Sequence, residues 1–203
     1  MKNIVLGTKN KDKLRELQAL LKGANVKVLS LNDFPRCPDV HENGRTFEEN
    51  AKKKARFYAK RTKALTLADD SGLMVSCLNG KPGVYSARFA GPGCTYHDNN
   101  EKLLGLLKRF TGSKRQAKFV CVMALYDRKG LVQVVRGECR GRIAFSQKGA
   151  RGFGYDPVFI PAGFSKTFAE LSPKTKNRIS HRGKALRKAR RVILRHFASL
   201  DSE

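Results

Sequence analysis

Apolar residues in the first thirty positions follow two spacings, that of a strand and that of a helix. Residues 4–6 are consecutively apolar, a polar turn occupies 7–10, and between 11 and 22 the leucines recur three or four residues apart. This pattern predicts a buried strand, a turn and an amphipathic helix. A second short strand is predicted at 26–29.

The next elements surround a pair of acidic residues. Thr46 and Glu49 have the spacing of a capping box, which predicts a helix that runs to about Arg61. Residues 65–68 form an apolar run that we expect to be a buried strand ending at the acidic pair. Residues 72–93 are rich in glycine and proline, which favours a long, shaped loop of the kind that often holds a ligand.

The remaining pattern predicts a hairpin and a terminal helix. Residues 117–126 and 131–137 are rich in strand-forming residues and flank a polar turn, so we expect a β-hairpin there. A helix is expected at 98–110, where leucines recur with helical periodicity. Two more short strands and one long terminal helix are predicted at 143–145, 157–160 and 174–198.

Length and composition indicate one globular domain. A chain of 203 residues with 40% hydrophobic and 29% charged residues is long enough to bury one substantial core, so residues 1–203 are expected to form a single domain. The five cysteines are widely spaced and odd in number, which indicates neither a disulfide framework nor a zinc ribbon. No apolar run approaches the ~18 residues that a membrane span requires. We therefore expect a cytoplasmic protein.

The charge of the chain departs from that of an ordinary globular protein. Lys and Arg outnumber Asp and Glu by 42 to 17, which gives a formal net charge of +25. A surface of this sign attracts polyanions. Phosphate chemistry and nucleic-acid binding are therefore the first two candidate functions.

Two polar groups follow predicted strands. Thr8, Asn10 and Lys13 stand at a turn before a helix, where free backbone N–H groups and the helix dipole favour an anion such as phosphate; Thr8 or Asn10 could instead only cap the helix. Asp69 and Asp70 follow the strand at 65–68. Two carboxylates there could hold Mg²⁺ and accept a proton from water, or could only form an Asx turn.

Two further segments carry aromatic and basic residues. The segment 152–157, Gly-Phe-Gly-Tyr-Asp-Pro, holds an aromatic pair between glycines and could stack on a base, or could only cover the core. The segment 180–183, Ser-His-Arg-Gly, follows Lys174 and Lys176 and offers cationic donors to a phosphate or a purine carbonyl. As an isolated basic patch it could equally be a solvated helix face.

The four segments together resemble the inosine triphosphate pyrophosphatase family. The resemblance runs from about Asn3 to Ala189 and also includes Thr46 and the residues after it. Its motifs are ADDSGL, GKPGVYSARFAG, GFGYDPVF and ISHRGKAL. It implies an elongated α/β fold with a mixed β-sheet flanked by helices, two lobes with a nucleotide-binding cleft between them, and a homodimer.

The resemblance also implies residue roles. The triphosphate would be bound by Thr8, Asn10, Lys13 and Lys54. Asp70 would be the catalytic base and a Mg²⁺ ligand, with Glu42 as the second metal ligand. The remaining substrate contacts would be Ser71, Phe153, Gly154, Tyr155, Asp156, Lys176, His181 and Arg182.

The implied reaction is hydrolysis of purine nucleoside triphosphates of the inosine and xanthosine type (ITP, dITP, XTP) to the monophosphate and pyrophosphate, which would cleanse the nucleotide pool. Relatives in this family often have adjacent acids near Glu42, whereas His41 precedes it here. Asp69 and Asp39 are therefore the next candidates for the second metal ligand.

Two rival functions remain open. A nucleic-acid-binding module would use the charge and the terminal helix, where residues 174–195 carry many cations and no acid. A nonspecific nucleic-acid contact from the basic surface is compatible with this function and with the pyrophosphatase function. The second rival is a pyrophosphatase for pyrimidine nucleotides. Release of pyrophosphate from a panel of triphosphates with and without Mg²⁺ separates the three.

Overall fold

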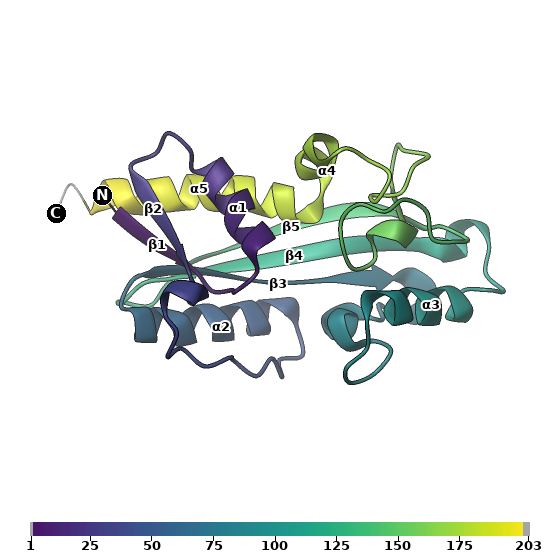
Figure 1. Ribbon diagram of the computed structural model, residues 1–203, viewed down its shortest axis with the longest axis horizontal. Helices are drawn as coiled ribbons and strands as arrows, with labels where there is room; N and C mark the ends of the chain where they lie inside the picture. Colours follow the sequence, from purple (N-terminus) through teal and green to yellow (C-terminus); the bar gives the residue numbers. More distant parts are fainter. Residues whose placement is uncertain (1, 201–203) are drawn as a thin grey trace. The chain divides into compact units, whose positions relative to one another are not determined.

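A computed structural model describes residues 2–200 of the chain, the side chain of Asp12 excepted. Its strands and α-helices alternate from β1 to β4, and β5, β6, α4 and α5 then follow in that order (Figure 1). The strands are β1 Lys2–Leu6, β2 Val26–Ser30, β3 Leu65–Val75, β4 Gln116–Tyr126, β5 Leu131–Ile143 and β6 Phe159–Pro161. The α-helices are α1 Lys11–Leu20, α2 Phe47–Thr62, α3 Tyr96–Leu106, α4 Pro173–Ile179 and α5 His181–Ser199.

The strands form one mixed sheet in the order β2-β1-β3-β4-β5-β6. β1 runs parallel to both β2 and β3, whereas β5 and β6 are antiparallel. The predicted hairpin is confirmed: Asp127 N–H donates to the Gly130 carbonyl at 2.9 Å in the turn between β4 and β5. The α/β class and the mixed sheet implied by the resemblance are confirmed as well.

The chain divides into two compact units. Unit 1 comprises residues 1–70, 121–136 and 184–203, and unit 2 comprises 71–120 and 137–183. In unit 1, Ile4 and Leu6 of β1 join a core cluster with side chains of α1 and α5. Val5 belongs to a different cluster, which includes Tyr58 of α2. Because side chains alternate along a strand, α1 and α5 cover one face of β1 and α2 covers the other, as Figure 1 shows.

Unit 2 has its own core. Leu73 and Val75 of β3 pack with Leu103 and Leu107 from α3 and the segment after it, and with aromatic side chains of the later strands and loops. Those aromatic side chains are Phe119, Tyr155, Phe159 and Phe168. The segment 152–156, predicted to carry chemistry, is therefore attached to this second core through Tyr155.

Three expected element boundaries were wrong. The strand predicted at 65–68 continues as β3 to Val75, because Leu73 and Val75 are fully buried and extend the alternation past the acidic pair. The predicted strand at 143–145 is absent from the described residues, since β5 ends at Ile143. The strand predicted at 157–160 is β6, Phe159–Pro161.

The long helix predicted at 174–198 is divided at Ser180. Ser180 has an extended backbone (φ −65°, ψ 157°) and ends α4. Its hydroxyl accepts a hydrogen bond from Gly183 N–H at 3.1 Å, in the first turn of α5. Gly183 is required there because a Cβ would collide with the Asn177 carbonyl oxygen. The periodicity of leucine and alanine could not reveal this break, because it lies in a polar, basic stretch.

Candidate active site

The turn after β1 is held by a close approach of the backbone to β3. A Cβ on Gly7 would lie 2.9 Å from the Tyr58 ring and 3.0 Å from Ala68 Cβ, so only glycine fits. Beyond it, Asn10 Oδ1 accepts a hydrogen bond from Lys13 N–H at 3.1 Å, and Thr8 Oγ1 accepts one from Asn10 N–H at 3.2 Å. Asn10 thus caps α1, which is the alternative left open by the sequence, and the two roles are compatible.

Lys13 is placed against the first acid of the pair. Its Nζ lies 2.9 Å from both carboxylate oxygens of Asp69, whose side chain is only 5% exposed. Asp69 is therefore an almost fully buried carboxylate whose charge is balanced by the cation predicted to hold phosphate. The pairing with both oxygens of Asp69 gives the Lys13 ammonium a defined position.

The second acid, Asp70, contacts a different set of groups. Asn50 of α2 donates from Nδ2 to Asp70 Oδ2 at 2.9 Å. Burial raises the pKa of Asp70 to about 6; the charge of Lys54 and the hydrogen bond from Asn50 oppose this, while Glu42 and Asp69 raise the pKa further. A carboxyl group with this pKa is ionised at neutral pH and is a stronger base than an ordinary aspartate.

Glu42 lies in the same electrostatic environment. Lys54 Nζ is 2.8 Å from Glu42 Oε2, and the Lys54 side chain is only 12% exposed. The alternative ligand Asp39 instead pairs at 2.9 Å with Lys9 and is 80% exposed. Glu42 therefore fits the role of second carboxylate beside Asp70 better than Asp39 does, and better than Asp69, whose two oxygens are occupied by Lys13.

The donor set of unit 1 suits a hard divalent cation. Among the described residues no three His, Cys, Asp or Glu side chains form a group able to hold a metal ion by themselves. Mg²⁺ is typically held by one or two carboxylates, with water and substrate phosphates completing its shell. Asp70 and Glu42 supply that number, and burial, with smaller contributions from the charges of Glu42 and Asp69, raises the pKa of Asp70.

In unit 2, the segment 152–156 is folded around a buried carboxylate. Asp156 is 3% exposed; its Oδ2 accepts from Phe153 N–H at 2.8 Å and pairs with Lys176 Nζ at 2.5 Å. Burial raises the pKa of Asp156, and the charges of Lys176 and Arg182 oppose that shift. Gly152 (φ +79°) is required because a Cβ there would collide with Asp156 Oδ2.

The two aromatic rings of this segment have different environments. Phe153 is 39% exposed, and the Lys176 ammonium and the Arg182 guanidinium lie 5.0 and 5.8 Å from its ring centroid. Tyr155 is buried, and its hydroxyl donates to the Ser86 carbonyl at 2.9 Å. Only Phe153 can therefore present a ring to a flat ligand such as a nucleobase.

Arg182 and His181 begin α5 and are fixed by their packing. Arg182 Nη2 donates to Ser71 Oγ at 3.4 Å, and the His181 ring stacks on Phe119 with centroids 4.5 Å apart and an interplanar angle of 8°. Ser71, Arg182, Lys176, Phe153 and Asp156 thus form one connected group in unit 2. Gly154 belongs to the same turn and has a positive φ of +62°.

Sequence reasoning missed the residues that hold these groups in place. Asn50 fixes Asp70, and Ser86 accepts from Leu73 N–H at 2.9 Å as well as from Tyr155. Asn100 of α3 is 2% exposed and donates to the Gly154 carbonyl at 3.0 Å. Ser86 stands inside the quoted motif GKPGVYSARFAG, and Asn50 belongs to the segment after Thr46 that the resemblance includes. Asn100 has no signal in the sequence, because its role depends on a contact 54 residues away.

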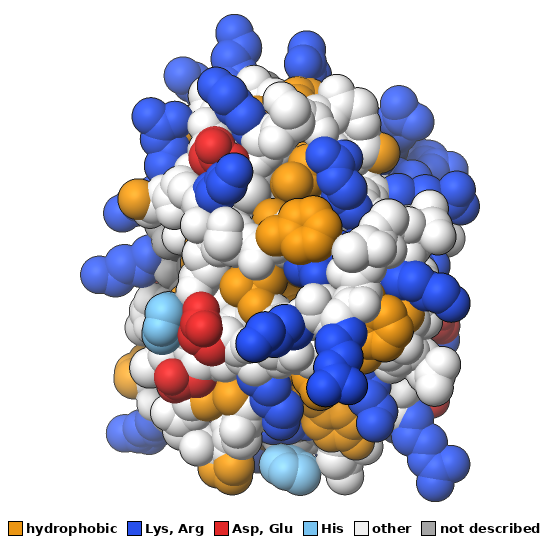
Figure 2. Space-filling model, turned by 90° about the vertical axis from the view of Figure 1, so that its right-hand side faces the viewer, with side chains coloured by type: hydrophobic (Ala, Val, Ile, Leu, Met, Phe, Trp, Pro, Cys, Tyr) orange, Lys and Arg blue, Asp and Glu red, His pale blue; other side chains and the backbone are white. Residues whose placement is uncertain are grey.

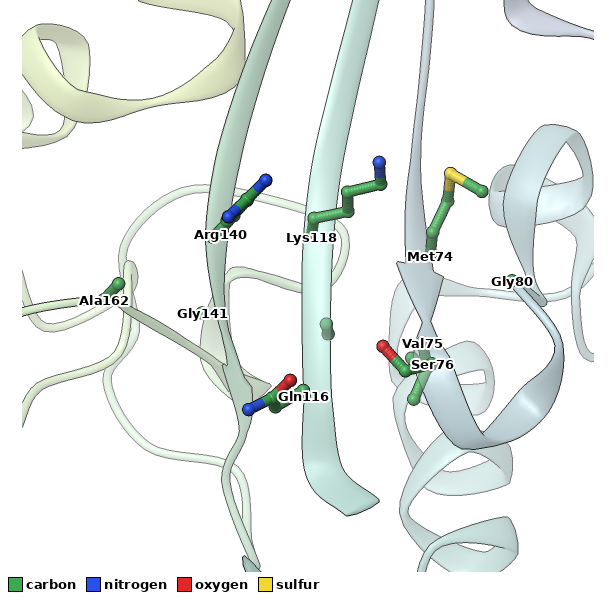
Figure 3. A pocket seen from close by; sticks show the side chains of 10 residues that line it. Met74, Val75, Ser76, Gly80, Gln116, Lys118, Arg140, Gly141 and Ala162 are labelled. Atoms are coloured by element: carbon green, nitrogen blue, oxygen red, sulfur yellow. The ribbon is translucent and has the colours of Figure 1, made fainter. Parts of the chain in front are cut away.

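A cavity of about 510 Å³ lies elsewhere in unit 2 (Figure 3). Met74, Lys118 and Arg140 project into it from three neighbouring strands, and Gln116 contributes an amide. Lys118 is paired with Glu138 at 3.4 Å. None of the predicted site residues is among the described residues that line this cavity, so it is separate from the carboxylate and lysine groups described above.

The α/β fold places Asp70 of β3, a half-buried carboxylate of raised pKa, near Lys54 and Glu42, an arrangement that suits an enzyme hydrolysing phosphorylated substrates. Comparison with known proteins gives a narrower assignment: the model of the Ham1 family matches residues 4–192. The chain therefore belongs to the Ham1 family, and the resemblance found in the sequence is confirmed.

Individual relatives match over nearly their whole length. The dITP/XTP pyrophosphatase of Desulforamulus reducens is 48% identical over 96% of both chains, and that of Bacillus anthracis is 46% identical over 97% of this chain and 98% of the relative. A HAM1 protein from Coxiella burnetii has a similar structure, with a TM-score of 0.90 and 42% identity over 96% of this chain and all of that one. None of the helices among the described residues is both long and apolar enough to cross a membrane.

Proposed function

We propose that the protein hydrolyses purine nucleoside triphosphates of the inosine and xanthosine type (ITP, dITP, XTP) to the monophosphate and pyrophosphate, and so removes them from the nucleotide pool. The observation that carries this proposal is Asp70, a half-buried carboxylate with a pKa of about 6 that accepts a hydrogen bond from Asn50 near Lys54 and Glu42. The relatives named dITP/XTP pyrophosphatase support the choice of substrate.

In the proposed reaction a water molecule attacks the α-phosphorus in line with the leaving group. Asp70 accepts the proton of this water, the new P–O bond forms, and the bond from the α-phosphorus to the bridging oxygen breaks, so that its electron pair leaves with pyrophosphate. Lys13 and Lys54 balance the negative charge of the triphosphate. Thr8 and Asn10, in the turn before α1, would contact phosphate oxygens.

Asp70 and Glu42 would hold Mg²⁺ as the cofactor. When bound, the ion would neutralise phosphate charge and polarise the phosphorus, which is the contribution that carboxylate-held metal ions make to phosphoryl transfer. Asn50 keeps one oxygen of Asp70 in a fixed position by donating to it, and Lys54 does the same for Glu42. These two contacts leave the chain's own residues ordered for the ion before substrate arrives.

Base selection is assigned to the group in unit 2. Phe153 would stack on the purine, with Gly154, Tyr155 and Asp156 completing the wall, while Lys176, His181, Arg182 and Ser71 would make the polar contacts. A guanidinium can only donate hydrogen bonds, so Arg182 suits the 6-oxo group of hypoxanthine or xanthine and opposes the 6-amino group of adenine. Each unpaired buried polar group costs about 1–3 kcal/mol, so a few mismatches suffice for discrimination.

The test is a panel of nucleoside triphosphates assayed for pyrophosphate release with Mg²⁺ and with chelator. We expect turnover of dITP, ITP and XTP to exceed that of the adenine, guanine and pyrimidine triphosphates by at least about tenfold, which corresponds to ~1.4 kcal/mol. Equal turnover of pyrimidine triphosphates would overturn the substrate assignment. Undiminished turnover in chelator would overturn the metal assignment and leave the substrate assignment standing.

We further propose that the two units act as one domain, that the protein is a homodimer and that it works in the cytoplasm. β3, β4 and β5 each have residues in both units, which supports the single domain. All five cysteines are free, which is compatible with a reducing compartment. Light scattering of the purified protein measures the mass directly; a mass of one 22.7 kDa chain at micromolar concentration would contradict the dimer.

A further inference from the structure

The exposed side of α5 carries a continuous row of cations. Five Lys or Arg residues occupy its exposed positions at spacings of three and four residues, which places them on one face of the helix. We call this row the α5 stripe; its members are Lys184, Arg187, Lys188, Arg191 and Arg195. With a rise of about 1.5 Å per residue, the stripe is about 16 Å long.

The stripe is anchored to a rigid part of unit 1. The opposite side of α5 contributes Ala185, Ala189 and Ile193, all fully buried, to the core cluster that also contains β1 and α1 side chains. Lys188 Nζ donates to the Arg136 carbonyl at 2.7 Å, and the exposed Arg136 adds a cation on the neighbouring strand β5. The helix that carries the stripe is therefore packed against the core of unit 1.

The stripe concentrates charge of one sign on one face of the helix. α5 has no acidic residue in its first turn and none along its length. All five cations of the stripe are exposed, so the positive charge of this face is accessible to a partner. A surface of this sign attracts polyanions.

We propose that the α5 stripe binds the phosphate backbone of double-stranded nucleic acid without reading its sequence. A DNA duplex has one negative charge per ~1.7 Å of axis, and lysine and arginine contacts release its condensed counterions. The shape and sign of the stripe match this backbone. This activity is separate from the hydrolysis proposed above and does not depend on it.

The side chains between the cations favour a duplex over other anionic partners. Proteins that bind single strands combine cations with aromatic rings on which bases stack, and the aromatic residue of α5, Phe197, is buried. Helices that bind anionic lipid surfaces place large apolar side chains beside the cations. The exposed positions from Lys184 to Arg195 hold only Lys and Arg.

The matched control addresses the general basicity of the protein. Figure 2 shows that Lys and Arg also outnumber Asp and Glu on another face of the molecule, so net charge alone could attract nucleic acid. The stripe variant is Arg187→Gln with Arg191→Gln. The control variant is Arg56→Gln with Lys60→Gln, two exposed cations at the same i, i+4 spacing on α2. Both pairs lower the net charge by two and insert the same good helix former.

The experiment measures binding of a fluorescent DNA duplex by anisotropy over a range of salt concentrations. We expect the stripe variant to lose at least about tenfold in affinity at 0.1 M salt, and the slope of log K against log salt to become less negative by about 1.8, that is 0.9 for each of two lost contacts. The control variant should lose less than about threefold. Thermal unfolding and pyrophosphate release should be unchanged in both.

Three results would overturn the proposal. Equal loss in both variants would show that binding follows net charge and has no site on α5. Tighter binding of single-stranded DNA, or of vesicles containing anionic lipid, than of the duplex would assign the stripe to that partner instead. Absence of duplex binding by the unaltered protein at 50 mM salt would show that the stripe has no nucleic-acid role.

Discussion

Asp69 and Asp70 are adjacent in the chain, but their side chains leave β3 on opposite faces, because successive side chains alternate along a strand. Asp69 accordingly contacts Lys13 of α1, and Asp70 contacts Asn50 of α2. Adjacent acids therefore have different surroundings: Asp69 pairs with Lys13, whereas Asp70 accepts from Asn50 and has a pKa that is raised mainly by burial.

The raised pKa predicts how stability depends on pH in metal-free buffer. Because the folded protein holds the Asp70 proton more tightly than the unfolded chain, protonation stabilises the fold fully below about pH 3.8, and this stabilisation is lost as the pH rises through about 6. Asp70→Asn should abolish this decline. At pH 7.5 the variant should be more stable by at most about 3 kcal/mol, from about 2.2 pH units at 1.36 kcal/mol each.

Urea unfolding of both proteins between pH 4 and 7.5 in chelator measures this difference, with Asp39→Asn as the control for an exposed carboxylate. If the wild type and Asp70→Asn curves run parallel across that range, the raised pKa is wrong. The same variant should lose nearly all pyrophosphate release, since an amide cannot accept the proton from water. Loss of turnover without the gain in stability would leave the catalytic role intact and remove its electrostatic explanation.

Arg182 predicts a change in selectivity. Its guanidinium contacts Ser71 and lies near the exposed ring of Phe153. If it donates to the purine 6-oxo group, Arg182→Ala should lower kcat/KM for ITP by about one to two orders of magnitude, the value of a charged hydrogen bond of ~1.5–3 kcal/mol, and change that for ATP little. Lys174→Ala, an exposed cation on α4, is the control. An unchanged ratio of the two kcat/KM values would assign Arg182 to the phosphates.

At the scale of elements, the sequence indicated types of structure more accurately than their ends. Hydrophobic patterns predicted β1, α1 and the β4–β5 hairpin, and the capping box of Thr46 and Glu49 predicted α2. Periodicity failed at β3, where the polar residues 69–71 interrupt the apolar pattern although the strand continues to Val75. It also failed at Ser180, which ends α4 and separates it from α5.

At the candidate site, too, sequence reasoning named one set of residues and missed another. The residues of the family motifs were named from the sequence. In unit 1 the structure places Lys54 and Glu42 near Asp70, and Lys13 against Asp69. In unit 2 it places Phe153, Lys176 and Arg182 near Asp156. The residues that support them were not named, since a buried Asn or Ser looks like any polar residue until its partner is known. Asn100 and Ser86 acquire their roles from contacts 54 and 69 residues distant.

The segment 152–156 is held in place by such contacts. Tyr155→Phe tests one of them, the hydrogen bond from the Tyr155 hydroxyl to the Ser86 carbonyl. The change keeps the buried ring and removes the hydrogen bond to the Ser86 carbonyl, which should cost about 1–3 kcal/mol because a buried acceptor loses its partner. We expect KM for dITP to rise several-fold with kcat within about twofold, because Phe153 is repositioned and Asp70 is not. Amide exchange at 152–156 should become faster.

Tyr85→Phe is the matched control, since Tyr85 is 58% exposed. A fall in kcat with KM unchanged would indicate that Tyr155 acts on the chemical step, and a fall in stability with neither constant altered would indicate a role in the core alone. Either result would contradict a positioning role for the hydroxyl.

For the whole molecule, the important feature is that each unit is built from separate parts of the chain. Unit 1 needs residues 1–70, 121–136 and 184–203, and the two parts of unit 2 lie between them. Neither unit can therefore be excised as one segment. The order of synthesis also matters, because unit 1 lacks part of its core until the C-terminal residues have been made.

A chain ending at Gly183 should therefore fail to form unit 1. The missing segment carries Leu186, Val192, Ile193 and Phe197, all at most 9% exposed in the core with β1 and α1. Burial of such side chains contributes about 1.5–3 kcal/mol each, or ~6–12 kcal/mol together, which equals the whole free energy of unfolding of an ordinary domain.

A chain ending at Ser199 keeps all four and should unfold at a temperature close to that of the full chain. Circular dichroism and amide exchange measure both. Native-like protection of β1 in the shorter chain would show that the α5 contacts contribute little to unit 1 and that its core is sustained by α1, α2 and the strands alone.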